Sequence, residues 1–159
     1  MAGERVLAGS GSDAGVGRGG PVNVTVLLCD AAQEANGKLY ILGGGWSIKG
    51  PEPTPMAIAI KIDVPWNEAN ERHEFVLMLE SGDGGVIEFP GPDGSQAVRI
   101  DGNFEVGRPA GTPAGSDIDA ALAVNIGPLP LAPGLYSWQL AIDDQAPTEW
   151  RRTFAVRTR

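Results

Sequence analysis

The sequence predicts an all-β protein, an antiparallel β-sandwich of about eight or nine strands. Two observations carry this prediction. Five stretches alternate apolar and polar residues with a period of two, namely residues 56–64, 98–106, 118–126, 136–142 and 150–156. Gly and Pro, 23 and 13 in number, fall between the alternating stretches, as turns require. Because successive side chains of a strand point to opposite faces, each stretch has one buried side and one side nearer to water, as antiparallel sheets have.

The remaining strands are expected at residues 22–29, 38–47, 72–80 and 86–89. Residues 30–37 are interpreted as a helical turn or a polar loop. Residues 66–70 are interpreted as the loop of a hairpin between residues 56–65 and 72–80. Further turns or loops are expected at residues 81–85, 90–95 and 108–116. Gly43, Gly44 and Gly45 interrupt a strand pattern, which indicates a bulge, a bend or a close backbone approach.

The segment LAPGLY, residues 131–136, is the most specific structural signal. In immunoglobulin-like and fibronectin-type sandwiches, a Leu-x-Pro-Gly-x-Tyr segment precedes a core strand. The tyrosine hydroxyl then bonds back to the backbone in a tyrosine corner. Tyr136 opens the expected strand 136–142, as this motif requires. We therefore expect an immunoglobulin-like or fibronectin-like C-terminal half. The alternative is an ordinary Pro-Gly turn followed by a core tyrosine.

Composition divides the chain into a Gly-rich N-terminal tail, residues 1–21, expected to be flexible, and a single domain, residues 22–159. The net charge of -8 disfavours nucleic acid as a partner. A short basic cluster lies at the C-terminus and comprises Arg151, Arg152, Arg157 and Arg159. The chain shows neither a signal peptide nor an apolar run of the roughly 18–20 residues that span a bilayer. We therefore expect no membrane partner and a cytoplasmic location.

The sequence shows no constellation typical of catalysis, so we expect no enzyme, no catalytic residues, and no cofactor or metal site. Residues 15–20 match G-x-G-x-x-G, but they lack the preceding strand and the following helix that a dinucleotide site needs. His73, the one histidine, is interpreted as a structural residue at a strand end. Cys29 is expected to be a small buried residue, because the neighbouring Asp30 opposes thiolate formation.

Two residue types keep an alternative open. Seven aspartates lie in or near expected turns: Asp83, Asp93, Asp101, Asp117, Asp119, Asp143 and Asp144. Calcium binding would need several of these loops to converge, since the ion takes about six to eight oxygen ligands. Trp46 and Trp66 lie outside the core pattern. They are interpreted either as exposed contact residues for a protein or sugar, or as caps on the ends of the sandwich.

Three short motifs stand together in residues 28–49: Cys-Asp-x-Ala from Cys29, GKLY at residues 37–40 and GGGW at residues 43–46. With these motifs the segment resembles the opening of an uncharacterised bacterial family of small β-rich proteins, a domain of unknown function with members in actinobacteria. The likeness continues through residues 131–136. The resemblance implies a bacterial source and a compact single domain, and it carries over no activity and no functional residue.

We expect a non-catalytic protein-interaction or structural module, with a protein partner or self-association. The alternative is a small-ligand or carbohydrate-binding sandwich, assisted by calcium, with its site near Trp46 and Trp66. An enzyme comes third. An exposed tryptophan in a concave polar site would favour ligand binding, whereas a flat apolar patch or a long exposed edge strand would favour a protein partner.

Overall fold

The computed structural model describes residues 22–159, so the expected flexible tail lies outside the described residues. The strands are β1 (Asn23–Ala35), β2 (Lys38–Gly44), β3 (Ile48–Lys49), β4 (Met56–Val64), β5 (His73–Ser81), β6 (Glu88–Gly91), β7 (Gly94–Ala97), β8 (Arg99–Phe104), β9 (Ile118–Ile126), β10 (Gly134–Ile142) and β11 (Arg151–Val156). Two short 3-10 helices, η2 (Trp66–Glu68) and η3 (Thr148–Trp150), accompany them.

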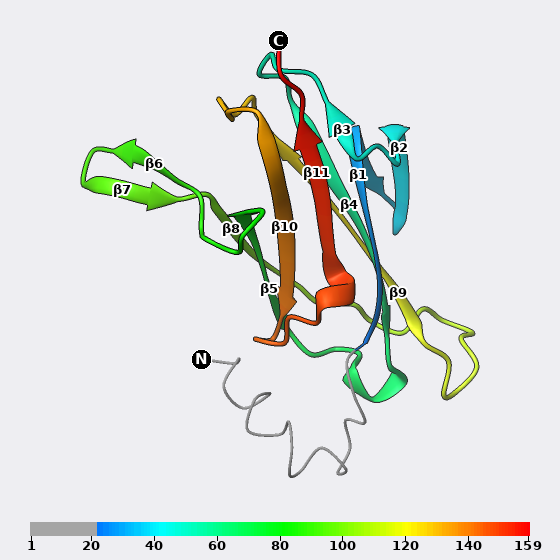
Figure 1. Ribbon diagram of the computed structural model, residues 1–159. Coiled ribbons are helices and arrows are strands. Elements are labelled where there is room, and N and C mark those ends of the chain that lie inside the picture. Colours follow the sequence, from blue (N-terminus) through cyan, green and yellow to red (C-terminus); the bar gives the residue numbers. More distant parts are fainter. Residues whose placement is uncertain (1–21) are drawn as a thin grey trace.

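Two sheets pack against each other as a β-sandwich (Figure 1). The first sheet has the order β2-β1-β4-β9, and the second has the order β3-β11-β10-β5-β8. Neighbouring strands are antiparallel, except that the two-residue β3 runs parallel to β11. The predicted antiparallel sandwich is therefore confirmed. Strands β6 and β7 form a separate hairpin, so residues 90–95 are the tip of a small two-stranded arm rather than a bare turn between longer strands.

The core lies between the two sheets and is filled by the apolar face of the alternating stretches. Strand β4 contributes five residues that are at most 1% exposed: Met56, Ile58, Ile60, Ile62 and Val64. Trp138 on β10 and Phe154 on β11 face them and are equally buried. Since the burial of apolar area is the main favourable term in folding, these side chains hold the sheets together.

The first correction concerns residues 30–37, which form neither a helical turn nor a polar loop. Strand β1 continues to Ala35, and the chain turns at Asn36 and Gly37, whose φ angles are 53° and 76°. Two positive φ angles identify the tight turn whose twist suits a two-residue hairpin. Pairing with β2 outweighs the weak strand preference of this polar segment. The dipeptide Asn36-Gly37 is the sequence signal that indicates the hairpin.

The second correction concerns the side of residues 56–64 that was expected to lie nearer to water. Ala57 and Ala59 on this side, the outer face of the first sheet, are only 0% and 2% exposed. Pairing between β1 and β4 ends at Cys29, after which β1 pairs only with β2. The side chain of Asn125 on β9 donates to the Ala32 carbonyl at 2.8 Å and accepts from the Ala32 amide at 3.2 Å. The end of β1 therefore lies over this face, and small side chains leave room for it.

The third correction concerns the expected hairpin between residues 56–65 and 72–80. Strands β4 and β5 lie in opposite sheets, and the segment containing η2 carries the chain across. Both stretches bury one face in the same core, so alternation alone does not distinguish a hairpin from a crossover. The resulting orders β11-β10-β5 and β4-β9 match strands G-F-C and B-E of immunoglobulin-like sandwiches.

Tyr136 forms the expected corner. It is 8% exposed, and its hydroxyl donates to the Ala132 carbonyl, four residues upstream, at 2.6 Å. The ring stacks on Phe154 with centroids 5.7 Å apart. The hydroxyl thus ties the incoming loop to the strand that corresponds to F, which is where a tyrosine corner belongs.

The glycines at the end of β2 meet a backbone requirement, and we expect Gly44→Val to destabilise the fold by about 1–3 kcal/mol. A Cβ on Gly44 would lie 2.9 Å from Ile41 Cγ2 and 3.0 Å from Leu27 Cδ2, while Gly43 has φ 61° and lies against Asp30. Urea midpoints would measure the loss. Gly127→Ala is the matched control, because a Cβ there meets nothing within 4 Å. Saturable nucleotide binding that is lost in a folded Gly44→Val protein would contradict this prediction.

Candidate functional site

The loop aspartates do not converge. Within residues 22–159, no group of three or more His, Cys, Asp or Glu side chains is placed to hold a metal ion. Asp101 pairs with Arg99 at 2.7 Å, and Asp119 pairs with Lys61 at 3.0 Å on another strand. These two carboxylates thus have local structural partners, and residues 22–159 supply no converging ligand set for the calcium alternative.

His73 lies at the start of β5 and is 3% exposed. Its Nδ1 is 2.8 Å from Oδ2 of Asp143, and its Nε2 is 3.2 Å from the backbone oxygen of Glu68. The ring also stacks on Phe104, with centroids 5.1 Å apart. Oδ1 of Asp143 accepts from the Glu74 amide at 2.9 Å. The histidine therefore connects the η2 segment, β5 and the turn after β10.

Both oxygens facing the His73 ring nitrogens are acceptors, so a doubly protonated ring satisfies both contacts. The hydrogen bond from Asp143 is the main influence that raises the pKa of His73, and it outweighs burial, which lowers it. A nucleophile–base pair would need a hydroxyl or thiol on one of these nitrogens. The nitrogens are held by Asp143 and Glu68 instead, which suits the structural role expected for His73.

Cys29 is fully buried, as expected. Its thiol donates to the Ala57 carbonyl at 3.5 Å. Burial first, and then the charge of Asp30, raise the pKa of the Cys29 thiol. A raised pKa keeps the thiolate scarce at neutral pH, so this residue packs rather than reacts.

Trp46 and Trp66 are half-buried and pack against the core. Trp46 meets Phe154 edge to face, with centroids 6.0 Å apart. The guanidinium of Arg108 lies 4.3 Å above the Trp66 ring. These contacts support the interpretation of both tryptophans as caps of the sandwich. Trp46 also lines a shallow depression together with Asp30, Lys49 and Thr54.

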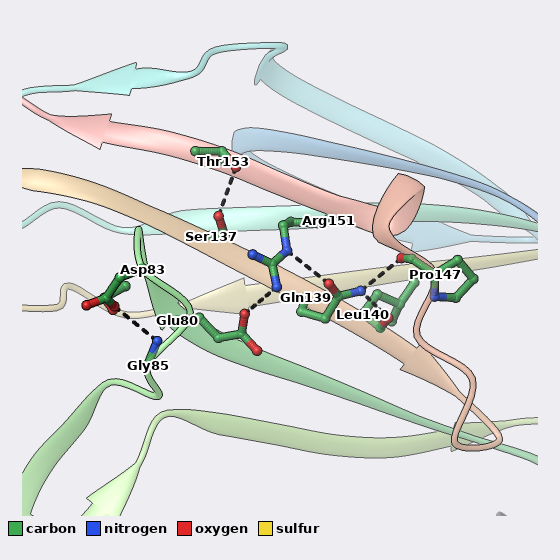
Figure 2. A network of polar contacts seen from close by, with 10 residues as sticks. Glu80, Asp83, Gly85, Ser137, Gln139, Leu140, Pro147, Arg151 and Thr153 are labelled. Carbon is green, nitrogen blue, oxygen red and sulfur yellow. Dashed lines mark hydrogen bonds and ion pairs between the residues drawn. The ribbon is translucent and has the colours of Figure 1, made fainter.

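A polar network covers part of the outer face of the second sheet (Figure 2). Arg151 on β11 donates to Glu80 on β5 at 2.6 Å and to Gln139 on β10 at 3.0 Å. Gln139 in turn donates to the Pro147 carbonyl at 3.1 Å, and the hydroxyls of Ser137 and Thr153 are bonded at 2.8 Å. These groups bond to one another, so the network is a structural tie between three strands.

The C-terminal arginines are occupied in the same way. Arg152 donates to the Val26 carbonyl of the opposite sheet at 2.8 Å. Arg159 is paired with Glu52. Arg151 is paired with Glu80, so three of the four arginines of the basic cluster have partners within the molecule, while Arg157 is exposed.

The most unusual surface of the described residues is the open edge of β2. Tyr40, Ile41 and Leu42 are 56%, 41% and 70% exposed. They border a shallow depression of about 330 Å³ together with Ala31, Ala32 and Gln33. Strand β2 is the last strand of its sheet, so one side of its backbone has no neighbouring strand among residues 22–159 (Figure 1).

The other edges of the two main sheets carry features that discourage strand pairing. Strand β3 has only two residues, and β8 presents the ion pair Arg99–Asp101. Strand β9 carries Asp119, and most of its residues are buried or half-buried, in contrast to those of β2. Charges and short length are common protections of sheet edges. Strand β2 has one charged residue, Lys38, at its beginning, and it contains no proline.

Ladder geometry shows which backbone groups of β2 face outward. In a two-residue hairpin the residues that flank the turn, here Ala35 and Lys38, form a hydrogen-bonded pair, and such pairs then alternate along the ladder. Lys38, Tyr40 and Leu42 therefore direct their backbone groups toward β1. Leu39 and Ile41 direct their N–H and C=O groups to the open edge.

Sequence reasoning missed this edge. The sequence pattern predicts a strand over residues 38–47 but does not indicate its position in a sheet. The available signal was the run Leu39–Leu42, which is apolar on both faces, unlike the half-polar stretches elsewhere. An apolar run in a strand predicts burial on both sides, and here the structure leaves most of it exposed.

Residues 22–159 thus form a β-sandwich with an exposed apolar sheet edge at β2. Residues 24–156 match a family of unknown function, DUF6941, and the chain belongs to that family. A search of curated proteins found no match. Among residues 22–159, no helix has the length and apolar character needed to cross a membrane.

Proposed function

We propose that the protein is a non-catalytic interaction module that binds an extended segment of a partner protein by strand addition at β2. The observation that carries the proposal is the open edge itself, with Tyr40, Ile41 and Leu42 exposed beside unpaired backbone groups. In strand addition, main-chain hydrogen bonds provide affinity and alternate side-chain contacts provide specificity.

The geometry defines what such a segment looks like. The backbone groups of Leu39 and Ile41 would bond to it, so the segment is extended and free of proline at the bonded positions. Tyr40 and Leu42 share one face of β2 with Ala31 and Gln33, over the depression of about 330 Å³. A segment with apolar residues at every second position would cover this face.

The alternative functions have less support. A carbohydrate site would need a free aromatic ring, and Trp46 and Trp66 are engaged by Phe154 and Arg108. We also propose that the protein is of bacterial origin and is located in the cytoplasm. The buried, unpaired thiol of Cys29 suits a reducing compartment, where disulfides are rare.

The test is a selection of binders from a library of ten-residue peptides, followed by amide hydrogen exchange. We expect selected peptides to alternate apolar and polar residues and to slow exchange at Leu39 and Ile41. Ile41→Pro removes an N–H that faces the open edge and leaves the hydrogen bonds between β1 and β2 in place. It should therefore weaken peptide binding at least about 10-fold. Leu42→Lys, a second variant at a 70% exposed position, should act in the same direction.

Leu135→Ser is the control, because Leu135 is 58% exposed and lies on β10 of the other sheet. It should leave binding unchanged. Peptides that bind Ile41→Pro and Leu42→Lys as tightly as the wild type would contradict the proposal, and so would a selection that yields no binder for a monomeric protein.

A further inference from the structure

We infer that the occupant of the β2 edge is a second copy of this chain, paired antiparallel about a two-fold axis. The inference rests on the proposed function, since it names the partner of the same edge. Closed two-fold dimers are the commonest soluble assemblies, and they require a surface that is complementary to itself. The argument therefore turns on whether β2 meets that requirement.

The hydrogen-bonding groups are self-complementary. Leu39 and Ile41 face outward, so Leu39 of one copy can form a bonded pair with Ile41 of the other, and Ile41 with Leu39. The axis then passes between the two Tyr40 residues, which form a non-bonded pair with Cβ atoms about 4.5–5.5 Å apart. This register uses only residues 38–42 and stops before Gly43, whose φ of 61° interrupts regular strand geometry.

The charge of β2 favours the antiparallel arrangement. Lys38 stands at one end of the strand and is its one charged residue. Antiparallel pairing places the two Lys38 residues at opposite ends of the interface, each opposite Leu42 of the other copy. A parallel arrangement would bring the two lysines together, and like charges opposite each other destabilise a sheet.

The apolar side chains complete the match. Leu42 of one copy lies opposite Lys38 of the other, whose aliphatic stem can cover it. The two Tyr40 rings meet at the centre, where aromatic pairs contribute most to cross-strand contacts. Joining the edges produces one continuous sheet, β9-β4-β1-β2 from each copy, and it removes the exposed strand edge that promotes aggregation.

Sedimentation velocity on the full chain, at rising protein concentration, tests the inference. We expect the mass to rise from the monomer to twice the monomer, with a dimer formed below about 1 mM. Ile41→Pro and Leu42→Lys should remain monomeric, and Leu135→Ser should behave as the wild type.

Cross-linking tests the register. Tyr40→Cys should form a disulfide-linked dimer under mild oxidation, since Cα atoms of a non-bonded antiparallel pair, about 4.5 Å apart, fall within the disulfide range. Leu135→Cys, an exposed position on the other sheet, should stay uncross-linked, and the native Cys29 is fully buried in both proteins.

The outcomes separate this inference from the proposed function. A wild type that stays monomeric at about 1 mM, while selected peptides still protect Leu39 and Ile41, would overturn the two-fold dimer and leave the β2 edge as a site for another protein. A dimer that survives Ile41→Pro and Leu42→Lys would overturn the inference by placing the interface elsewhere. A wild type that is monomeric, and whose selected peptides do not protect Leu39 and Ile41, would overturn the proposed function itself.

Discussion

Asp143→Ala is expected to lower the free energy of unfolding by about 3–5 kcal/mol, the cost of removing one partner from a buried charged pair. Asp143 is 5% exposed and holds two donors, Nδ1 of His73 and the Glu74 amide. Without its carboxylate, a buried imidazolium and a backbone N–H lose their acceptor. Urea denaturation would measure the difference.

Asp143→Asn separates the charge from the hydrogen bonds. The amide oxygen can still accept a hydrogen bond from one of the two donors, so we expect a loss smaller than that of Asp143→Ala. Equal losses would show that charge, rather than the number of acceptors, dominates at this site. A loss below about 1 kcal/mol for Asp143→Ala would contradict a buried ion pair.

The same pair predicts how stability depends on pH. The pKa of His73 is raised in the folded protein, chiefly by the hydrogen bond to Asp143. The folded state therefore holds the proton more tightly than the unfolded state, whose histidine pKa is about 6.5. The stabilisation is complete below that pKa and is lost as pH rises through the folded pKa. Because the chain has one histidine, His73→Gln should remove the fall in stability that the wild type shows as the pH rises above about 6.5.

Tyr136→Ala is the second large effect, with an expected loss of about 3–5 kcal/mol, because it empties an aromatic site packed on Phe154. Tyr136→Phe keeps the ring and removes only the bond to the Ala132 carbonyl, so it should cost about 0.5–1.5 kcal/mol. Both variants should shift the denaturant midpoint far more than the m-value. A Tyr136→Phe protein as stable as the wild type would show that the corner bond contributes nothing.

The sequence was sufficient for the fold class and for the core face of most strands. Alternation marks the side chains that face a core, as in residues 56–64, whose inner positions are all buried. The Tyr136 corner was predictable because Leu-x-Pro-Gly-x-Tyr is a local motif with one geometric purpose. Both predictions depend on residues close together in the chain.

The errors share the opposite property. Whether β4 and β5 pair in one sheet or face each other across the core depends on the whole topology, and the local pattern is the same in both cases. The burial of Ala57 depends on a segment of β1 that folds over it. The contacts of His73 arise from Asp143, 70 residues away. The open edge of β2 is likewise a statement about which strand is missing beside it, and no residue of β2 encodes that directly.

The way β1 is shared between two partners has a mechanical consequence. Its first half is bonded to β4 and its second half to β2, with the change at Cys29. The β1–β2 hairpin is therefore joined to the rest of the first sheet at Cys29, and the hydrogen bonds between Asn125 and Ala32 attach it a second time. A load on β2 along the strand acts on the whole β1–β2 ladder in shear, which is its stiff direction. A force perpendicular to the sheet bends the hairpin about Cys29, and the hydrogen bonds between Asn125 and Ala32 are then the first to break.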